Sequence, residues 1–407
     1  MARPNRYDPE KFGRLDGYLP KNVTGRITPN DDAGLPKEID VRGLPDGEWI
    51  SRGVYRMERV IPYGRTYGDS EFENPEKYSK TLEPWGCANS CVYLDLETTG
   101  LSRGTGTYAF LVGLGFCGRE NFRVVQLFLA SPGWERSWLS ALEAELPKDF
   151  GLVTYNGRSF DLPLLRTRYT LARAVPSWDE NPHLDLLLLA RHFYRGRMPS
   201  CSLGELEPRV LGVHRTADDI PGMYIPEMYT EFLRTTDATP LRGIFYHNTL
   251  DIVSLAALQT RISKLADMKG HGGEDMIRCG DLWNMTGDVE RAEAAWRRAL
   301  DFSTHANIAN ARLGEKAKSD GDYEAARDYF ERAAEGDKHP LRNLESLAKI
   351  EEHRIGDCEA ALAHAEAALK WLEARRPLRD YRWDLERQNL LHRIRRLKRK
   401  LGREDEN

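Results

Sequence analysis

Four acidic residues in short apolar contexts constrain the fold of this chain more than any other feature. Asp95 and Glu97 belong to residues 91–101 (CVYLDLETTGL), a run of apolar and β-favouring residues that stops at Gly100. Side chains at positions i and i+2 of a strand point to the same face. We therefore expect Asp95 and Glu97 to coordinate one cation together.

The third acidic residue follows a second predicted strand. Residues 152–165 (LVTYNGRSFDLPLL) read as a buried strand that breaks at Asn156 and Gly157 and then enters a helix. Asp161 lies near the start of that helix. A third carboxylate is thus predicted close to the carboxyl end of a strand.

The fourth acidic residue lies on a predicted apolar helix. In residues 245–258 (FYHNTLDIVSLAAL), Asp251 shares a helical face with Leu255 and Leu258 by its spacing, and His247 lies one turn earlier on that face. A carboxylate directed into an apolar stripe is costly unless a positive group meets it.

These residue types are suited to metal-assisted hydrolysis. Oxygen ligands without a thiolate suit Mg²⁺ or Mn²⁺ rather than zinc. Two such cations stabilise the attacking and leaving oxygens of an in-line phosphoryl displacement. His247 has the ordinary pKa, roughly 6.5, of a base that activates water near neutral pH. The constellation therefore predicts phosphodiester hydrolysis.

Residues from about 90 to 266 resemble the ribonuclease H-like domain of the YprB family, within the DEDD 3′-5′ exonuclease superfamily. Beyond the acidic contexts, the likeness rests on GTGTYAFLVGLG (104–115), HLDLL (183–187), CSLGELE (201–207), DIPGMYIP (219–226) and HNTLDIVSL (247–255). The resemblance implies that two Mg²⁺ or Mn²⁺ ions are held by the carboxylates, with a catalytic histidine beside them: Asp95, Glu97, Asp161, Asp251 and His247.

The water-activating residue is the point at which the sequence departs from better-known DEDD enzymes. Those enzymes place a His five residues before the last Asp or a Tyr four before it, whereas Tyr246 and His247 occupy these positions in the opposite order here. The shared helical face with Asp251 and the YprB-like HNxxD pattern both favour His247.

A net charge of −4 provides no overall attraction to nucleic acid, so a phosphate-binding surface has to be local. We expect residues beside the acids to contact the nucleic acid: Asn156, Arg158, Tyr246 and Asn248.

The order of elements predicts an α/β fold, a ribonuclease H-like mixed five-stranded sheet flanked by helices, and an all-α repeat domain after it. The expected segments are a Pro/Gly-rich region, partly disordered or draped on the core (1–88), the ribonuclease H-like exonuclease domain (89–266), tetratricopeptide-like repeats (270–372) and a basic amphipathic helix (373–407). Residues 53–64 alternate enough to form a strand or two against the domain.

The repeats are recognised by a recurring Gly-Asp pair. The pairs begin at Gly287, Gly321 and Gly356, 34 and 35 residues apart, and each precedes an alanine-rich helix. This is the period of tetratricopeptide repeats, whose arrays often bind a protein partner. In the last helix, six basic residues between 393 and 400 predict a solvated cap or a nucleic-acid contact.

Composition favours a cytoplasmic protein. The amino terminus is charged and lacks the apolar stretch of a signal peptide, and no apolar run approaches the roughly 18 residues of a membrane span. The six scattered cysteines are expected to be reduced thiols.

Two functions remain open. One is a metal-dependent nuclease, a 3′-5′ exonuclease. The alternative is a nucleic-acid-binding or inactive ribonuclease H-like adapter that recruits a protein through its helical repeats. Four intact acids favour the nuclease.

Overall fold

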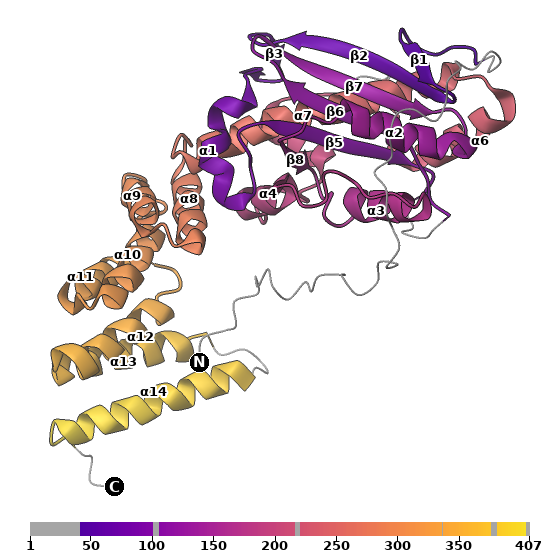
Figure 1. The fold of residues 1–407 in the computed structure, drawn as a ribbon. Coiled ribbons are helices and arrows are strands. Elements are labelled where there is room, and N and C mark those ends of the chain that lie inside the picture. The colour runs from indigo at the N-terminus through magenta and orange to yellow at the C-terminus, as the bar shows by residue number, and fades with distance from the viewer. Residues whose placement is uncertain (1–40, 101–105, 216–219, 336, 376–380, 404–407) are drawn as a thin grey trace. The chain divides into compact units, whose positions relative to one another are not determined.

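The computed structural model describes residues 41–100, 106–215, 220–335, 337–375 and 381–403. Contacts divide the chain into two units, Met1–Ser263 and Lys264–Asn407. The first unit is built on a sheet and the second contains helices, as Figure 1 shows.

A mixed seven-stranded sheet forms the centre of the first unit, with the order β1-β2-β7-β6-β5-β8-β9. Its strands are β1 (Glu48–Ser51), β2 (Val54–Pro62), β5 (Cys91–Thr98), β6 (Ala109–Cys117), β7 (Asn121–Leu129), β8 (Gly151–Thr154) and β9 (His183–Asp185). Antiparallel pairing joins β5, β6 and β7, whereas β8 and β9 add in parallel beyond β5. This is the predicted ribonuclease H-like order.

The prediction of five strands is wrong in number, because two strands from the N-terminal segment extend the sheet. β2 pairs with β7 along its whole length, from Val54 opposite Leu129 to Pro62 opposite Asn121. The alternation in residues 53–64 therefore did mark a strand. Residues 1–40, where disorder or draping was expected, lie outside the described residues.

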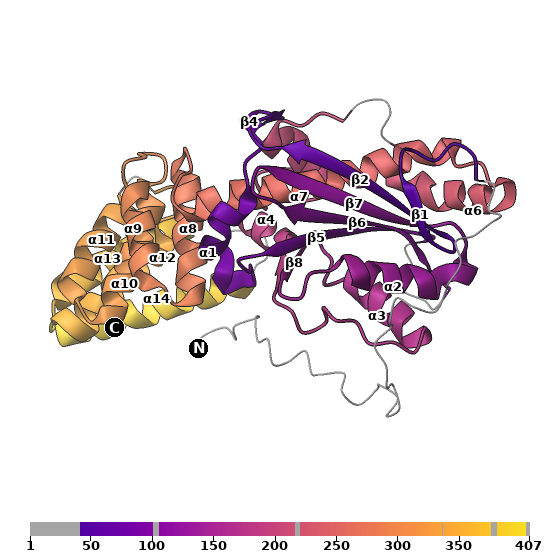
Figure 2. The ribbon, with the colours of Figure 1, turned by 45° about the horizontal axis from the view of Figure 1, so that its top comes forward.

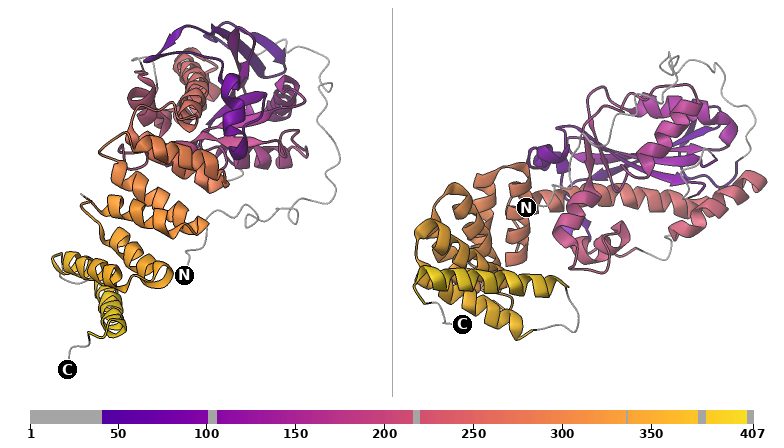
Figure 3. Two further views of the ribbon diagram at one scale, coloured as in Figure 1. Left: turned by 90° about the vertical axis from the view of Figure 1, so that its left-hand side faces the viewer. Right: turned by 90° about the horizontal axis from the view of Figure 1, so that it is seen from below.

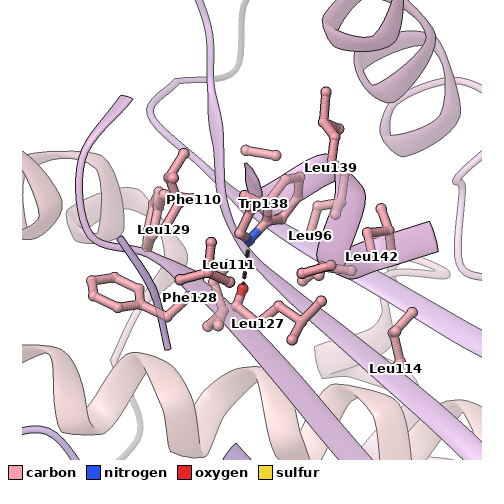
Figure 4. Close-up of a cluster of buried hydrophobic side chains, with 14 of the residues drawn as sticks. Leu96, Phe110, Leu111, Leu114, Leu127, Phe128, Leu129, Trp138, Leu139 and Leu142 are labelled. Atoms are coloured by element: carbon pink, nitrogen blue, oxygen red, sulfur yellow. Dashed lines mark hydrogen bonds between the residues drawn. The ribbon is translucent and has the colours of Figure 1, made fainter. Parts of the chain in front are cut away.

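Helices cover both faces of this sheet. α2 (Glu135–Glu145) and α3 (Asp161–Leu171) lie on one face, and α7 (Arg242–Ala266) crosses the other, as Figures 1 and 3 show. Trp138 anchors α2, since its indole N–H donates to the carbonyl of Leu127 at 2.9 Å within the leucine-rich core of Figure 4.

Shorter elements complete the first unit. They include β3 (Thr66–Tyr67), β4 (Ser70–Glu71), α1 (Ser79–Leu82), α4 (Leu186–Tyr194), α5 (Leu203–Leu206), the helical turn η5 (Glu207–Leu211) and α6 (Ile225–Thr235). All six cysteines are free, and the sulfurs of Cys87 and Cys91 are 3.7 Å apart.

The second unit contains successive helices that stack side by side in Figure 2. They are α8 (Gly273–Thr286), α9 (Val289–Ala299), α10 (Ala306–Asp320), α11 (Tyr323–Ala334), α12 (Leu341–Ile350), η8 (Glu351–Ile355), α13 (Cys358–Glu373) and α14 (Tyr381–Lys400). Within the described residues, no helix combines the length and apolar character needed to cross a membrane.

Each Gly-Asp pair ends one helix and starts the next. The glycines have φ of 82°, 84° and 88°, the left-handed region that glycine adopts without a steric penalty. The following aspartates, Asp288, Asp322 and Asp357, each accept a hydrogen bond from a main-chain N–H three residues later. The repeated dipeptide is therefore a repeated helix boundary. The tetratricopeptide assignment itself stays a prediction.

Candidate metal and catalytic site

The centre of the sheet presents the first two acids. Asp95 and Glu97 lie on β5, opposite Gly113 and Leu111 of β6. Glu97 is buried, with 8% of its surface exposed, whereas Asp95 is half-buried. Strand geometry directs both side chains to the face that α7 crosses.

A missing side chain on β6 lets α7 approach this strand. A Cβ atom on Gly113 would lie 2.3 Å from Oδ1 of Asn248 and 2.9 Å from Ile252. In that space the Asn248 amide donates to Oδ2 of Asp95 at 2.8 Å and accepts from Gln126 of β7 at 2.8 Å. The amide of Asn248 thus bridges over Gly113 and fixes the Asp95 carboxylate.

α7 also supplies a histidine, His247, directly before Asn248, and a third carboxylate, Asp251, one turn later. Nε2 of His247 lies 3.3 Å from Oδ2 of Asp251 and 4.0 Å from Oε1 of Glu97. Ligand atoms of these three residues all lie within 4.8 Å of one another. The predicted helical face, with His247 one turn before Asp251, is present.

Asp161 is the first residue of α3. This helix follows β8, which neighbours β5 on the side away from β6. The preceding turn is held by Asp185, whose carboxylate accepts from the main-chain N–H of Asn156 at 2.8 Å and of Arg158 at 3.2 Å. Asn156 has φ of 65°, a strained conformation for a residue with a side chain. Asp185 therefore positions the segment that delivers Asp161.

The acids raise one another's pKa values. Burial, followed by the charges of the other three carboxylates, raises the pKa of Asp95 well above its ordinary value. Burial is also the main cause that raises the pKa of Glu97 to about 8 and that of Asp161 to about 7. All four carboxylates are therefore close enough to repel, although Asp95 and Asp161 lie outside the compact set of three ligands.

Asp251 is the exception, because cationic groups meet it. Burial acts to raise its pKa, but hydrogen bonds and charge from His247 and Arg215 lower it overall. For His247, burial acts to lower the pKa, and the hydrogen bond and charge of Asp251 outweigh this and raise it to about 9.

Arg215 is a site residue that the sequence analysis missed. Its guanidinium donates to Oδ1 of Asp251 and, at 3.0 Å, to Nδ1 of His247. The same guanidinium pairs with Glu207 through two bonds of 2.6 and 2.8 Å. Since Arg only donates, Nδ1 of His247 accepts this bond. The proton of the neutral imidazole is then on Nε2, which faces the acids. Arg215 is therefore the positive group that meets the Asp251 carboxylate.

Glu207 holds Arg215 in place. Only 1% of its surface is exposed, and Ser254 of α7 donates to it at 2.5 Å, while the Tyr67 hydroxyl lies 2.7 Å from that of Ser254. A cavity of about 450 Å³ opens beside this network. Its lining is Leu203, Gly204, Glu207, Pro208, Val213, His214, Arg215, His247 and Asp251. One residue of this network could have been found from the sequence, because the CSLGELE motif contains Glu207.

The predicted nucleic-acid contacts divide into two groups. Arg158 is exposed and Tyr246 and Asn156 are half-buried, so their side chains are at least partly accessible. Asn248 is fully buried and bonded to Asp95 and Gln126. The prediction that Asn248 contacts nucleic acid is not supported by this geometry, which makes it a positioning residue for Asp95.

The sheet order and the acids on β5, α3 and α7 define a ribonuclease H-like domain. Residues 92–263 match the family model of the RNase_H superfamily. The chain is also 32% identical over 258 residues to a Bacillus subtilis (strain 168) protein described as "Uncharacterized protein YprB". That match covers 60% of this chain and 62% of the relative, so it spans less than two thirds of the relative's length. The predicted resemblance to a ribonuclease H-like domain and to YprB is confirmed.

The site fits a divalent metal ion. Glu97, His247 and Asp251 supply two carboxylates and an imidazole within 4.8 Å, a donor set that a divalent cation accepts. Burial, followed by the charges of neighbouring carboxylates, raises the pKa values of Glu97 and Asp95, and a bound cation would neutralise those charges.

Proposed function

We propose that this chain is a metal-dependent nuclease, a 3′-5′ exonuclease in which Asp95, Glu97, Asp161 and Asp251 hold two Mg²⁺ or Mn²⁺ ions. The observation that carries the proposal is the convergence of Glu97, His247 and Asp251 in a domain that matches the RNase_H superfamily. When bound, the two ions would stabilise the attacking and leaving oxygens of a phosphodiester.

The protein residues supply orientation and a base. Asn248 holds Asp95, and Arg215 holds Asp251 and His247, so the carboxylates are positioned before substrate arrives. We assign His247 as the base that activates water beside Glu97 and Asp251. The bond from Arg215 to Nδ1 places the proton of the neutral imidazole on Nε2, so Arg215 has to release Nδ1 before Nε2 can accept a proton. Arg158, Asn156 and Tyr246 are the proposed contacts for the nucleic-acid chain, since their side chains are exposed or half-buried.

The deciding experiment uses oligonucleotides labelled at the 5′ or the 3′ end, incubated with Mg²⁺, Mn²⁺ or excess chelator. A 3′-5′ exonuclease releases labelled mononucleotides from the 3′-labelled strand and gives a shortening ladder from the 5′-labelled strand. Single- and double-stranded DNA and RNA are compared in parallel. Asp95→Asn is the inactive variant, and Asp179→Asn, which alters an exposed ion pair with Arg166, is the matched control.

One observation supports the adapter alternative. Arg215 bonds to Oδ1 of Asp251, so one oxygen of a proposed metal ligand is already occupied by a cationic side chain. An adapter would bind oligonucleotides without cleaving them, and Asp95→Asn would leave its binding unchanged. Cleavage in excess chelator would contradict the metal-dependent mechanism instead.

A further inference from the structure

The helical unit contains a second group of metal-ligating side chains, far along the sequence from the acids of the sheet. Glu331 lies on α11, Glu351 directly follows α12, and His364 lies on α13. One ligand atom from each lies within 4.8 Å of the others. Three successive helical elements of the repeat unit therefore contribute to one cluster.

The carboxylate of Glu351 is incompletely satisfied. No surface of Glu351 is exposed. Its Oε2 lies 2.8 Å from Nδ1 of His364, while Oε1 is buried and has no hydrogen-bond partner among the described residues. A buried polar atom without a partner costs about 1–3 kcal/mol, and more where it carries charge.

The adjacent residue shows how this unit satisfies a buried carboxylate with side chains alone. Glu352 is equally shielded and is bonded to Arg393, Arg396 and Lys400 at 2.5–3.0 Å. Glu351, one residue earlier, has the imidazole of His364 instead of such a set of cations. The contrast between neighbouring buried glutamates points to a positive group that completes the surroundings of Glu351.

We infer that Glu331, Glu351 and His364 form a binding site for a divalent cation of the zinc class. Carboxylates and one imidazole are ordinary zinc ligands, with bonds of about 2.0–2.2 Å. A tetrahedral ion needs its ligand atoms roughly 3.3–3.5 Å apart. The side chain of Glu331 is 49% exposed and lies 4.0 Å from Arg327, a loose surface pair that ligation of the ion would replace. The imidazole makes zinc a better fit than Mg²⁺.

The site has an open side. A cavity of about 560 Å³ is lined by Glu331 and His364. The other charged residues of its lining are Asp328, Arg332 and Glu335. Three protein ligands leave one position of a tetrahedral ion for water on this side. The three carboxylates of the lining outnumber the single guanidinium of Arg332, so the field of the cavity attracts a cation.

Zinc alone is the probe, added to the full chain in the presence of excess Mg²⁺ to occupy the acids of the sheet. Zinc retained after dialysis is counted by metal analysis, and Co²⁺ substitution gives visible absorption that reports tetrahedral coordination. We expect one zinc equivalent to remain bound in an Asp251→Asn protein, where the proposed nuclease site is impaired. This separates the helical site from the proposed nuclease.

The variants are Glu351→Gln and His364→Gln, which preserve polarity and size, and His353→Gln is the control because its side chain is 51% exposed beside Glu352. Each ligand change should weaken zinc binding by roughly 10-fold or more, and the control should not. Retention of the zinc and of the Co²⁺ absorption in both ligand variants, with far-UV circular dichroism unchanged, would overturn the site. So would a wild-type chain whose bound zinc disappears entirely with Asp251→Asn.

Discussion

The guanidinium of Arg215 bonds to Oδ1 of Asp251 and leaves Oδ2 to face His247, 3.3 Å from Nε2. A cationic side chain therefore supports a carboxylate of the candidate metal site, and Glu207, 1% exposed, supports that cation in turn. Arg215 is held by Glu207 and in turn holds Asp251, so we assign it as a positioning residue.

Arg215→Lys tests this role. Lysine presents one point charge and cannot reproduce the planar fork that reaches Glu207, Asp251 and His247 together. Small misplacements of catalytic groups lower rates by as much as 10²-fold, so we expect a fall in kcat of roughly 10- to 100-fold with nucleic-acid affinity little changed. The control is Arg166→Lys, an exposed pair. Equal activity and equal metal dependence in Arg215→Lys would remove Arg215 from the site.

The second prediction concerns metal binding and stability. Burial and mutual repulsion raise the pKa of Asp95, so its charge opposes folding when no metal is bound. Mg²⁺ at 100 times its Kd should stabilise the fold by about 2.7 kcal/mol. Asp95→Asn should remove most of this gain while slightly raising the melting temperature without metal. Thermal unfolding with and without Mg²⁺ measures both effects, and Asp179→Asn should behave as wild type.

The third prediction separates His247 from Tyr246. A general base contributes typically 10² to 10⁴ in rate, so His247→Ala should lose about that much activity in the labelled-oligonucleotide assay. Tyr246→Phe should lose little, since His247 and not Tyr246 lies against Asp251 and Glu97. If the tyrosine change does the greater damage, Tyr246 assists the water and the assignment of His247 is wrong.

Local patterns were sufficient to predict the elements that carry the acids. Period-two spacing placed Asp95 and Glu97 on one strand face, and period-3.6 spacing placed His247 beside Asp251. Each inference needed residues no more than a few positions apart. The same logic predicted the Gly-Asp helix boundaries, because a left-handed glycine and an N-terminal capping aspartate are local requirements.

Contacts between distant segments were not predictable in this way. Arg215 is 36 residues from Asp251, and nothing in its neighbourhood marks it as the partner of that carboxylate. The alternation of residues 53–64 indicated a strand. Its pairing with β7 could not be predicted, because it depends on which edge of the sheet is open. The bridging amide of Asn248 depends on Gly113, whose lack of a side chain matters only once α7 lies on the sheet.

The fourth prediction is a pH dependence. Burial, with the charges of Arg158 and Arg166, lowers the pKa of His183 to about 3. The folded state therefore keeps a neutral imidazole, whereas the unfolded chain takes up a proton below its ordinary value of roughly 6.5. Stability from this group is fully present above pH 6.5 and is lost as the pH falls towards 3.

Urea unfolding at pH 7, 6 and 5 measures this dependence. The free energy of unfolding should fall by roughly 1 kcal/mol per pH unit below 6.5 from His183. His183→Gln can keep a hydrogen bond to the Thr154 hydroxyl, which lies 2.9 Å from Nε2, without a titrating group. A slope between pH 7 and 5 that is the same in both proteins would show that His183 does not set it.

The last prediction concerns the basic C-terminal helix, whose function the sequence left open. Arg393, Arg396 and Lys400 of α14 all bond to the buried Glu352. Lys398 also pairs with Glu366, so at least four of the six basic residues between 393 and 400 are engaged within the helical unit. Loss of one partner of a buried charge group costs about 3–5 kcal/mol, so Glu352→Gln should destabilise α14 by about 3 kcal/mol or more.

The matched control is Glu359→Gln, since Glu359 pairs with Arg403 where both side chains are more than half exposed. An exposed pair contributes about 0–1 kcal/mol. Hydrogen exchange of peptides from α13 and α14 should accelerate strongly in Glu352→Gln and hardly at all in Glu359→Gln. A helix held mainly by its apolar stripe, Leu390, Ile394 and Leu397, would instead exchange alike in both variants. In that case the cations of α14 would be available to phosphate, and Glu352→Gln would steepen the salt dependence of nucleic-acid affinity.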